Sequence, residues 1–158
     1  MTQSRDRLST SAGRRRALGA LLLLAANAFA PLRALAAAWN TAAFAAKSVS
    51  DGLKAIGAAA HTESGLVELK APEIAENGAI VPIEVTSRVP GTQSIYLLAE
   101  KNQYPLAASF DFLNGAEPFV STRIKLNESA RLTAVVKADG KFYSATREVK
   151  VTIGGCGA

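Results

Sequence analysis

Residues 131–153 read RLTAVVKADGKFYSATREVKVTI, and they contain the strongest fold signal in the chain. Two runs rich in β-branched and aromatic residues, 131–138 and 142–153, flank the pair Asp139-Gly140. An Asp-Gly pair between such runs is typical of a two-residue β-hairpin turn. Along the second run Val149, Val151 and Ile153 alternate with polar residues, as expected for a strand with one buried face.

The same short-strand pattern extends back to Gly65. Apolar segments separated by turn residues predict further strands at about 67–69, 80–86, 94–100, 106–113 and 118–126. Pro82 cannot donate a ladder hydrogen bond, so we expect a sheet edge or a bulge there. Residues 39–57 carry apolar side chains at spacings of three and four, which predicts one helix. Core positions are expected for the aromatic residues Phe110, Phe112, Tyr96, Tyr104, Phe119, Phe142 and Tyr143.

These elements predict a mostly β protein. The expected fold is an immunoglobulin-like antiparallel β-sandwich of about seven strands, with one N-terminal α-helix and a flexible C-terminal glycine-rich arm. We divide the chain into a signal peptide (1–36), an N-terminal helix and linker (37–64), the sandwich (65–153) and the arm (154–158). The cysteine pair of antibody domains is absent from the sequence.

Residues 1–36 have the composition of an export signal. A basic stretch that includes Arg14-Arg15-Arg16 precedes the apolar run 17–30, and Ala34-Leu35-Ala36 supplies a cleavage motif. The run is too short to span a bilayer, which takes about 20 residues. Paired arginines before a weakly apolar run favour the twin-arginine route to the periplasm, with an ordinary arginine-rich secretory signal as the alternative.

Removal of this signal changes the charge of the protein. Six of the eighteen Lys and Arg residues and one of the thirteen Asp and Glu residues lie in 1–36, which leaves twelve of each sign. A mature chain without net charge gives no indication of a nucleic-acid or anionic-membrane partner.

The arm, residues 154–158, reads GGCGA and contains the only cysteine of the sequence, Cys156. Gly154, Gly155 and Gly157 surround it, and these residues favour backbone freedom and leave the thiol without bulky neighbours. No cation within the arm would lower the pKa of this thiol. The pattern therefore favours a thiol that carries a group for other enzymes over one that catalyses. A chance cysteine in an unimportant tail is the alternative.

Other chemistry is sparse in the sequence. His61, the only histidine, could act as a general base, but a solvated loop histidine is the simpler interpretation. One His and one Cys cannot complete a four-ligand metal site alone, and no nucleotide-binding or serine-hydrolase motif is present. We therefore expect no catalytic residue, no intrinsic cofactor and no metal.

The chain resembles a known family, SoxY, the sulfur-carrier subunit of the bacterial thiosulfate-oxidising (Sox) system. The resemblance is carried by AEKNQYPLAASFDF (99–112), VSTRIKL (120–126), ADGKFYSATREVKVTI (138–153) and the GGCGA tail, with shorter matches at 76–78 and 81–83. The tail of the family reads GGCGG, so Ala158 replaces its last glycine.

The resemblance implies a periplasmic carrier that is not an enzyme, with covalent attachment of sulfur intermediates at Cys156. It implies a heterodimer with a SoxZ-like subunit. A c-type cytochrome that joins thiosulfate to the cysteine and a di-metal hydrolase that releases sulfate would act on it, with a molybdenum–haem sulfane dehydrogenase as an optional further partner. Haem, molybdenum and metal ions would belong to those enzymes.

Two other functions remain open from the residues. One is an exported β-sandwich interaction module whose cysteine forms an intermolecular disulfide. The other is a thiol oxidoreductase, which the absence of a C-x-x-C motif disfavours.

Overall fold

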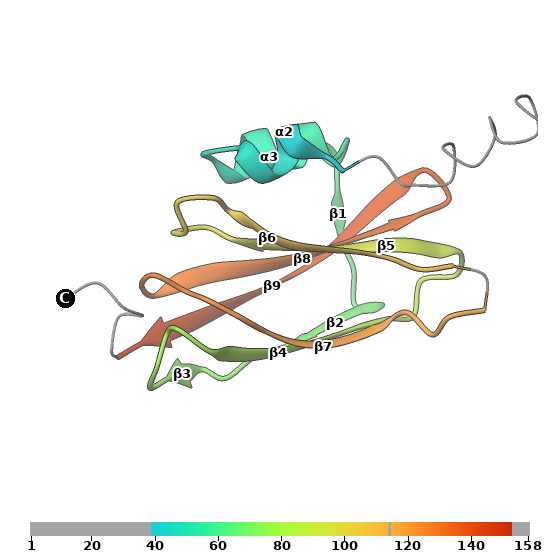
Figure 1. Ribbon diagram of the computed structural model, residues 1–158. Coiled ribbons are helices and arrows are strands. Elements are labelled where there is room, and N and C mark those ends of the chain that lie inside the picture. Colours follow the sequence, from blue (N-terminus) through green and yellow to red (C-terminus); the bar gives the residue numbers. More distant parts are fainter. Residues whose placement is uncertain (1–38, 114, 153–158) are drawn as a thin grey trace, which may run out of the picture. The chain divides into compact units, whose positions relative to one another are not determined.

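The computed structural model describes residues 39–113 and 115–152, and its strands form two sheets (Figure 1). The larger sheet has the order β1-β9-β8-β5-β6, and β3 also pairs with β9; the smaller sheet has the order β2-β4-β7. The strands are β1 (Thr62–Glu63), β2 (Val67–Lys70), β3 (Ile74–Ala75), β4 (Val81–Ser87), β5 (Thr92–Ala99), β6 (Leu106–Asp111), β7 (Phe119–Ile124), β8 (Ala130–Ala138) and β9 (Lys141–Val151). The predicted mostly β sandwich is confirmed, and all seven predicted strands are present.

The hairpin that joins β8 to β9 has the predicted turn. Ala138 pairs with Lys141, so Asp139 and Gly140 form a two-residue loop, with φ angles of 47° and 74°. Two consecutive residues with positive φ match the twist of a right-handed hairpin, which is why the Asp-Gly pair is favoured there. The hairpin extends in register to the pair Ala130–Val149.

Two short strands were not predicted. β1 and β3 each consist of two residues and pair with β9 in parallel, Thr62 opposite Tyr143 and Ile74 opposite Lys150. Because β8 occupies one edge of β9, both must lie along the other edge. Two-residue strands show no alternation in sequence, since tertiary pairing alone defines them.

Pro82 lies in the central strand of the smaller sheet and pairs with Arg123 without a register shift, so neither the sheet edge nor the bulge that we expected is found there. The amide of Ser87 donates to Pro118 on the β7 side, whereas the amide of Arg88 donates to Leu66 on the β2 side. Even-numbered residues of β4 therefore direct their amides toward β2, whose pairing with β4 ends at Lys70 opposite Glu84. The proline lies beyond that end, so its missing N–H costs no ladder hydrogen bond.

The protein has two apolar clusters. The larger one fills the space between the sheets and includes Ile83, Leu97 and Val136; the smaller one lies between the larger sheet and the helices and includes Leu98 and Val135. Adjacent residues of β5 and β8 thus face opposite clusters, as the period of a strand requires. Each fully buried Leu or Val stabilises the fold by about 1.5–3 kcal/mol.

The segment predicted as one helix forms two short ones, α2 (Thr41–Ala45) and α3 (Val49–Ala55). Ala46 adopts an extended ψ of 140°, and the Ser48 hydroxyl accepts a hydrogen bond from the Asp51 amide to begin α3. A serine that caps a new helix competes with continuation of the first one. Lys47, within the break, places its ammonium 3.6 Å from the centre of the Tyr104 ring.

Candidate functional site

The residues predicted to form the site, Gly154, Gly155, Cys156 and Gly157, lie outside the residues that the structure describes. The part of the site that the structure does describe is the end of β9, which leads to these four residues. We therefore built the site from the contacts that hold residues 147–152.

β9 is held along its length by β8 and by core packing. Its last pair with β8 joins Val149 to Ala130, and Val149 is fully buried between the sheets. Beyond Val149 the ladder with β8 stops. Any further order up to Thr152 must come from other contacts.

A second segment supplies those contacts on the outer edge of β9. We call residues 71–76, which include β3, the strap (Figure 1). The amides of Lys150 and Thr152 donate to the carbonyl oxygens of Glu73 and Ala75, at 2.9 and 3.1 Å. The Thr152 hydroxyl donates to the carbonyl oxygen of Glu76 at 3.4 Å.

Arg147, three residues before Lys150 on β9, also holds the strap. Its Nε donates to the Ala71 carbonyl oxygen at 3.1 Å, and its Nη2 lies 3.8 Å from Glu73 Oε1. Both side chains of that ion pair are substantially exposed, so its contribution to stability is at most about 1 kcal/mol. The hydrogen bond to the backbone is the more specific of the two contacts.

On the other edge, Ser129 replaces the strand that has ended. The amide of Val151 donates to Ser129 Oγ at 2.9 Å. Ser129 is the residue just before β8, so its side chain continues the hydrogen bonding of β9 past the last backbone pair. The end of β9 is therefore held from both edges up to Thr152.

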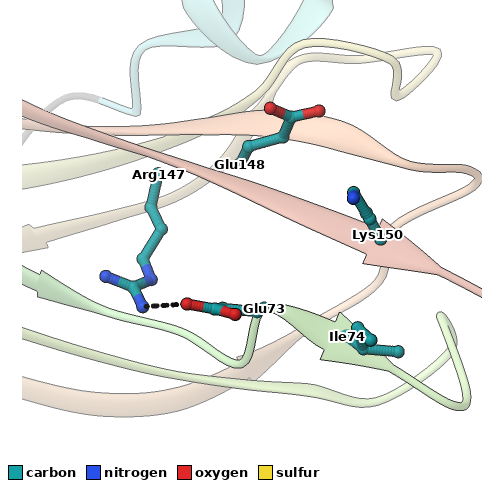
Figure 2. Close-up of a pocket in the computed structure, with 5 residues that line it drawn as sticks. All are labelled: Glu73, Ile74, Arg147, Glu148 and Lys150. Carbon is teal, nitrogen blue, oxygen red and sulfur yellow. Dashed lines mark ion pairs between the residues drawn. The ribbon is translucent and has the colours of Figure 1, made fainter.

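An open hollow of about 380 Å³ lies beside the strap, lined by Glu73, Ile74, Arg147, Glu148 and Lys150. Figure 2 shows Arg147 reaching toward Glu73, whereas Glu148 and Lys150 point to the opposite side of β9. Two cations and two carboxylates give the hollow no dominant charge. The side chains that line the hollow lie at the surface, and they suit recognition of another molecule more than catalysis.

His61 occupies a loop position, as the sequence suggested. Its Nδ1 lies 2.9 Å from the carbonyl oxygen of Ala58, so this nitrogen carries the proton in that hydrogen bond. The ring lines a second open hollow with residues that include Glu63, Glu100 and Arg131.

Most aromatic residues occupy the expected core positions, but two do not. Phe110, Phe112 and Tyr143 pack against the cluster between the sheets, and Tyr96 and Phe142 against the one beneath the helices. Phe119 and Tyr104 are 44% and 46% exposed. Among the described residues, Phe119 begins β7, an end strand of its sheet, and Tyr104 lies in the loop that contacts Lys47, so neither has a described strand on both sides to cover it.

Within 39–113 and 115–152, no three His, Cys, Asp or Glu side chains gather as metal ligands. Over the same residues, none of the helices has both the length and the apolar content needed to cross a membrane.

Sequence reasoning located the cysteine but not the strap or Ser129. The backbone contacts of the strap leave no side-chain pattern, and Ser129 looks like any exposed turn serine. The only available signal was Asn127-Glu128-Ser129, a polar stretch just before a strand, which does not indicate which amide the serine would bind.

A family model and a solved structure point to the same family. Residues 53–156 match the family described as Sulfur oxidation protein SoxY. The chain is also similar to the sulfur carrier protein SoxY from Chlorobium limicola f thiosulfatophilum, a solved structure, with 42% sequence identity and a TM-score of 0.61. That match covers 72% of this chain and 100% of the other.

A second solved structure, the human F-spondin reeler domain, shares 11% identity with a TM-score of 0.41, over 58% of this chain and 95% of the other. A similarity of that size supports no inference. No curated protein matches the chain.

Proposed function

This chain belongs to the SoxY family of sulfur oxidation proteins, and from that membership we propose that it carries sulfur intermediates covalently on Cys156. The single observation that supports this most strongly is the extent of the family match, which runs through the sandwich and includes Cys156 as its last residue. A carrier needs one attachment atom and a body that other proteins recognise. Cys156 would supply the first and the sandwich the second.

The proposed loading step is an oxidation. The Cys156 thiolate and thiosulfate join through a new S–S bond, giving Cys–S–S–SO₃⁻, and two electrons leave to the haems of a c-type cytochrome. This chain supplies the sulfur nucleophile, and the partner supplies the oxidant. Because nothing in the arm would lower the pKa of the thiol, we propose that the partner also promotes formation of the thiolate.

The proposed second step is hydrolysis. Water attacks the terminal sulfonate sulfur, the S–S bond to that sulfur breaks, and sulfate and two protons leave while a persulfide anion, Cys–S–S⁻, stays on Cys156. We assign this step to a di-metal hydrolase, and oxidation of the persulfide sulfur to a molybdenum–haem sulfane dehydrogenase. The chain itself acts as a substrate-bearing subunit and not as an enzyme.

Membership of the family also implies a SoxZ-like partner. β6 and β7 are end strands of their two sheets, and Phe119 and Leu113 near them are 44% and 83% exposed. Free strand edges and exposed apolar side chains favour association with another chain. We propose that the protein works as a heterodimer and self-associates when it is made alone.

We propose a periplasmic location after cleavage behind Ala36. The basic stretch before residue 17 and the Ala34-Leu35-Ala36 motif support export by the twin-arginine route. Cofactor-bearing enzymes that act on the arm would then have to be exported as well.

The test uses the mature chain with its SoxZ-like partner, thiosulfate and the c-type cytochrome enzyme. Intact-mass spectrometry should show a thiosulfate adduct on the wild-type chain, removable by reductant, and none on Cys156→Ser. If the cysteine instead gave only a stable disulfide-linked dimer, and no adduct under any of these conditions, the interaction-module alternative would replace the carrier proposal.

A further inference from the structure

The last three residues of the described chain lie at the margin of the core, where only Val151 is half-buried and packs against the cluster between the sheets. Val149 is the last residue of β9 that is fully buried, whereas Lys150 and Thr152 are exposed. Besides the packing of Val151 and the pairing of β3 with Lys150 and Val151, they are held by hydrogen bonds from Lys150 and Thr152 to the strap and from Val151 to Ser129. We call Ser129, Thr152 and these bonds the exit clamp.

Two features of the exit clamp separate it from ordinary sheet structure. The strand β3 beside it is only two residues long, and Ser129 contributes a side chain where a neighbouring strand would normally contribute a backbone carbonyl. Ser129 and Thr152 are both exposed, so burial of apolar surface does not account for either contact. The contacts fix the direction and the position of the backbone at residues 150–152.

We infer that Ser129 and Thr152 are positioning residues that fix the point from which the arm leaves the sandwich; this inference rests on the proposed carrier function. Cys156 is four residues beyond Thr152, a maximum reach of about 14 Å at ~3.3–3.6 Å per residue. If opening the exit clamp also releases Val151 from its partial packing against the core, the nearest anchor is Val149. Seven residues then separate the anchor from Cys156, and the maximum reach grows to about 25 Å.

A longer free segment lowers the rate of productive delivery. The effective concentration of a tethered group falls roughly as the −3/2 power of the tether length once the tether exceeds the required span. The full increase from four to seven residues therefore predicts a loss of up to about two-fold in delivery of Cys156 to a partner cleft. The chemistry of the thiol itself is unchanged.

The test compares two clamp variants with conservative controls, in the full heterodimer. Ser129→Ala removes the acceptor for Val151, and Thr152→Pro removes both the amide and the hydroxyl that bind the strap. Ser129→Thr and Thr152→Ser keep those groups. Amide hydrogen exchange at Val151, read by NMR, reports whether the exit clamp has opened.

Two rates are then measured on each protein. The kcat/KM of the c-type cytochrome enzyme for thiosulfate loading of Cys156 should fall by up to about two-fold when both clamp variants are combined. The rate of labelling by N-ethylmaleimide should not change, since a small reagent needs no positioned arm. The two conservative controls should load like the wild type.

Deletion of Gly154 distinguishes an effect of tether length from a general loss of loading. On this inference the wild-type arm has the length that the partner cleft requires, so the deletion should lower kcat/KM in the wild type, whereas in the double clamp variant it should raise kcat/KM toward the wild-type value. The inference would be overturned if the deletion lowered kcat/KM by the same factor in both proteins. It would also be overturned if the double variant, with its exit clamp shown to be open, loaded at the wild-type rate. If the wild type acquired no adduct, the proposed function would fail, and the inference with it.

Discussion

Gly91, between β4 and β5, packs against the carboxylate of Asp139, in the turn between β8 and β9. A Cβ atom added to Gly91 would lie 2.6 Å from Asp139 Oδ2, closer than real Cβ atoms approach. Gly91 also has a φ of 69°, which residues with a side chain adopt at a cost of about 1–2 kcal/mol. Two turns far apart in sequence therefore meet through a glycine.

Gly91→Ala should lower the free energy of unfolding by about 1–3 kcal/mol, because the left-handed strain and the displacement of Asp139 add together. Urea denaturation of the chain from residue 37 measures this. Gly140→Ala, with a φ of 74° and open space around it, isolates the strain and should cost about 1–2 kcal/mol. Gly65→Ala should cost less than either, and an equal cost at all three positions would contradict the prediction.

Cys156→Ser should abolish sulfur carriage and leave stability unchanged. Val149 is the last fully buried residue of the described chain, so a substitution seven residues later removes no described core contact. The thermal midpoint should match the wild type, while adduct formation is lost in intact-mass spectrometry. Retained sulfur-dependent turnover in this variant would rule out Cys156 as the carrier.

Gly155→Pro should separate the thiol from its delivery. Proline fixes φ near −65°, so an arm that must bend differently in each partner would be restricted while its sulfur stays present. The variant should react with a thiol reagent at the wild-type rate but acquire few adducts from the partner enzymes. Wild-type turnover would show that the arm needs no freedom at this position.

Replacement of Arg14, Arg15 and Arg16 by lysine should hold the protein in the cytoplasm, because the twin-arginine route reads paired arginines and not charge alone. Immunoblots of periplasmic and cytoplasmic fractions measure the distribution. Replacing Arg5 and Arg7 by lysine is the matched control, and it should leave export intact. Unchanged export of the first variant would instead indicate the general secretory route.

The sequence predicted those parts of the fold that depend on local pattern. The alternation of Val149 and Val151, the Asp139-Gly140 turn and the polar breaks between apolar runs were sufficient for the seven main strands. The adjacent apolar residues Leu97-Leu98 and Val135-Val136 contact the two clusters on opposite faces of the larger sheet, but the sequence predicted one helix without the face that it covers.

The parts that sequence could not predict depend on distant partners. β3 is a strand only because β9 passes beside it, and Phe119 is exposed only because β7 is an end strand. The helix divides at Ser48 because a local cap and the contact between Lys47 and Tyr104 together outweigh an apolar period that would continue. Each outcome is decided by a residue far away in sequence or by competition between two allowed local structures.

The parallel pairing of β1 and β3 with β9 also constrains when the protein can fold during its synthesis. Thr62 must wait for Tyr143, which the ribosome adds about 4–16 s later at roughly 5–20 residues per second. Until then the larger sheet lacks the strand that both segments require, and closing such long loops is slow. We therefore expect the sandwich to form only after nearly the whole chain has been translated, so that nascent chains present unpaired strand edges to chaperones for most of that time.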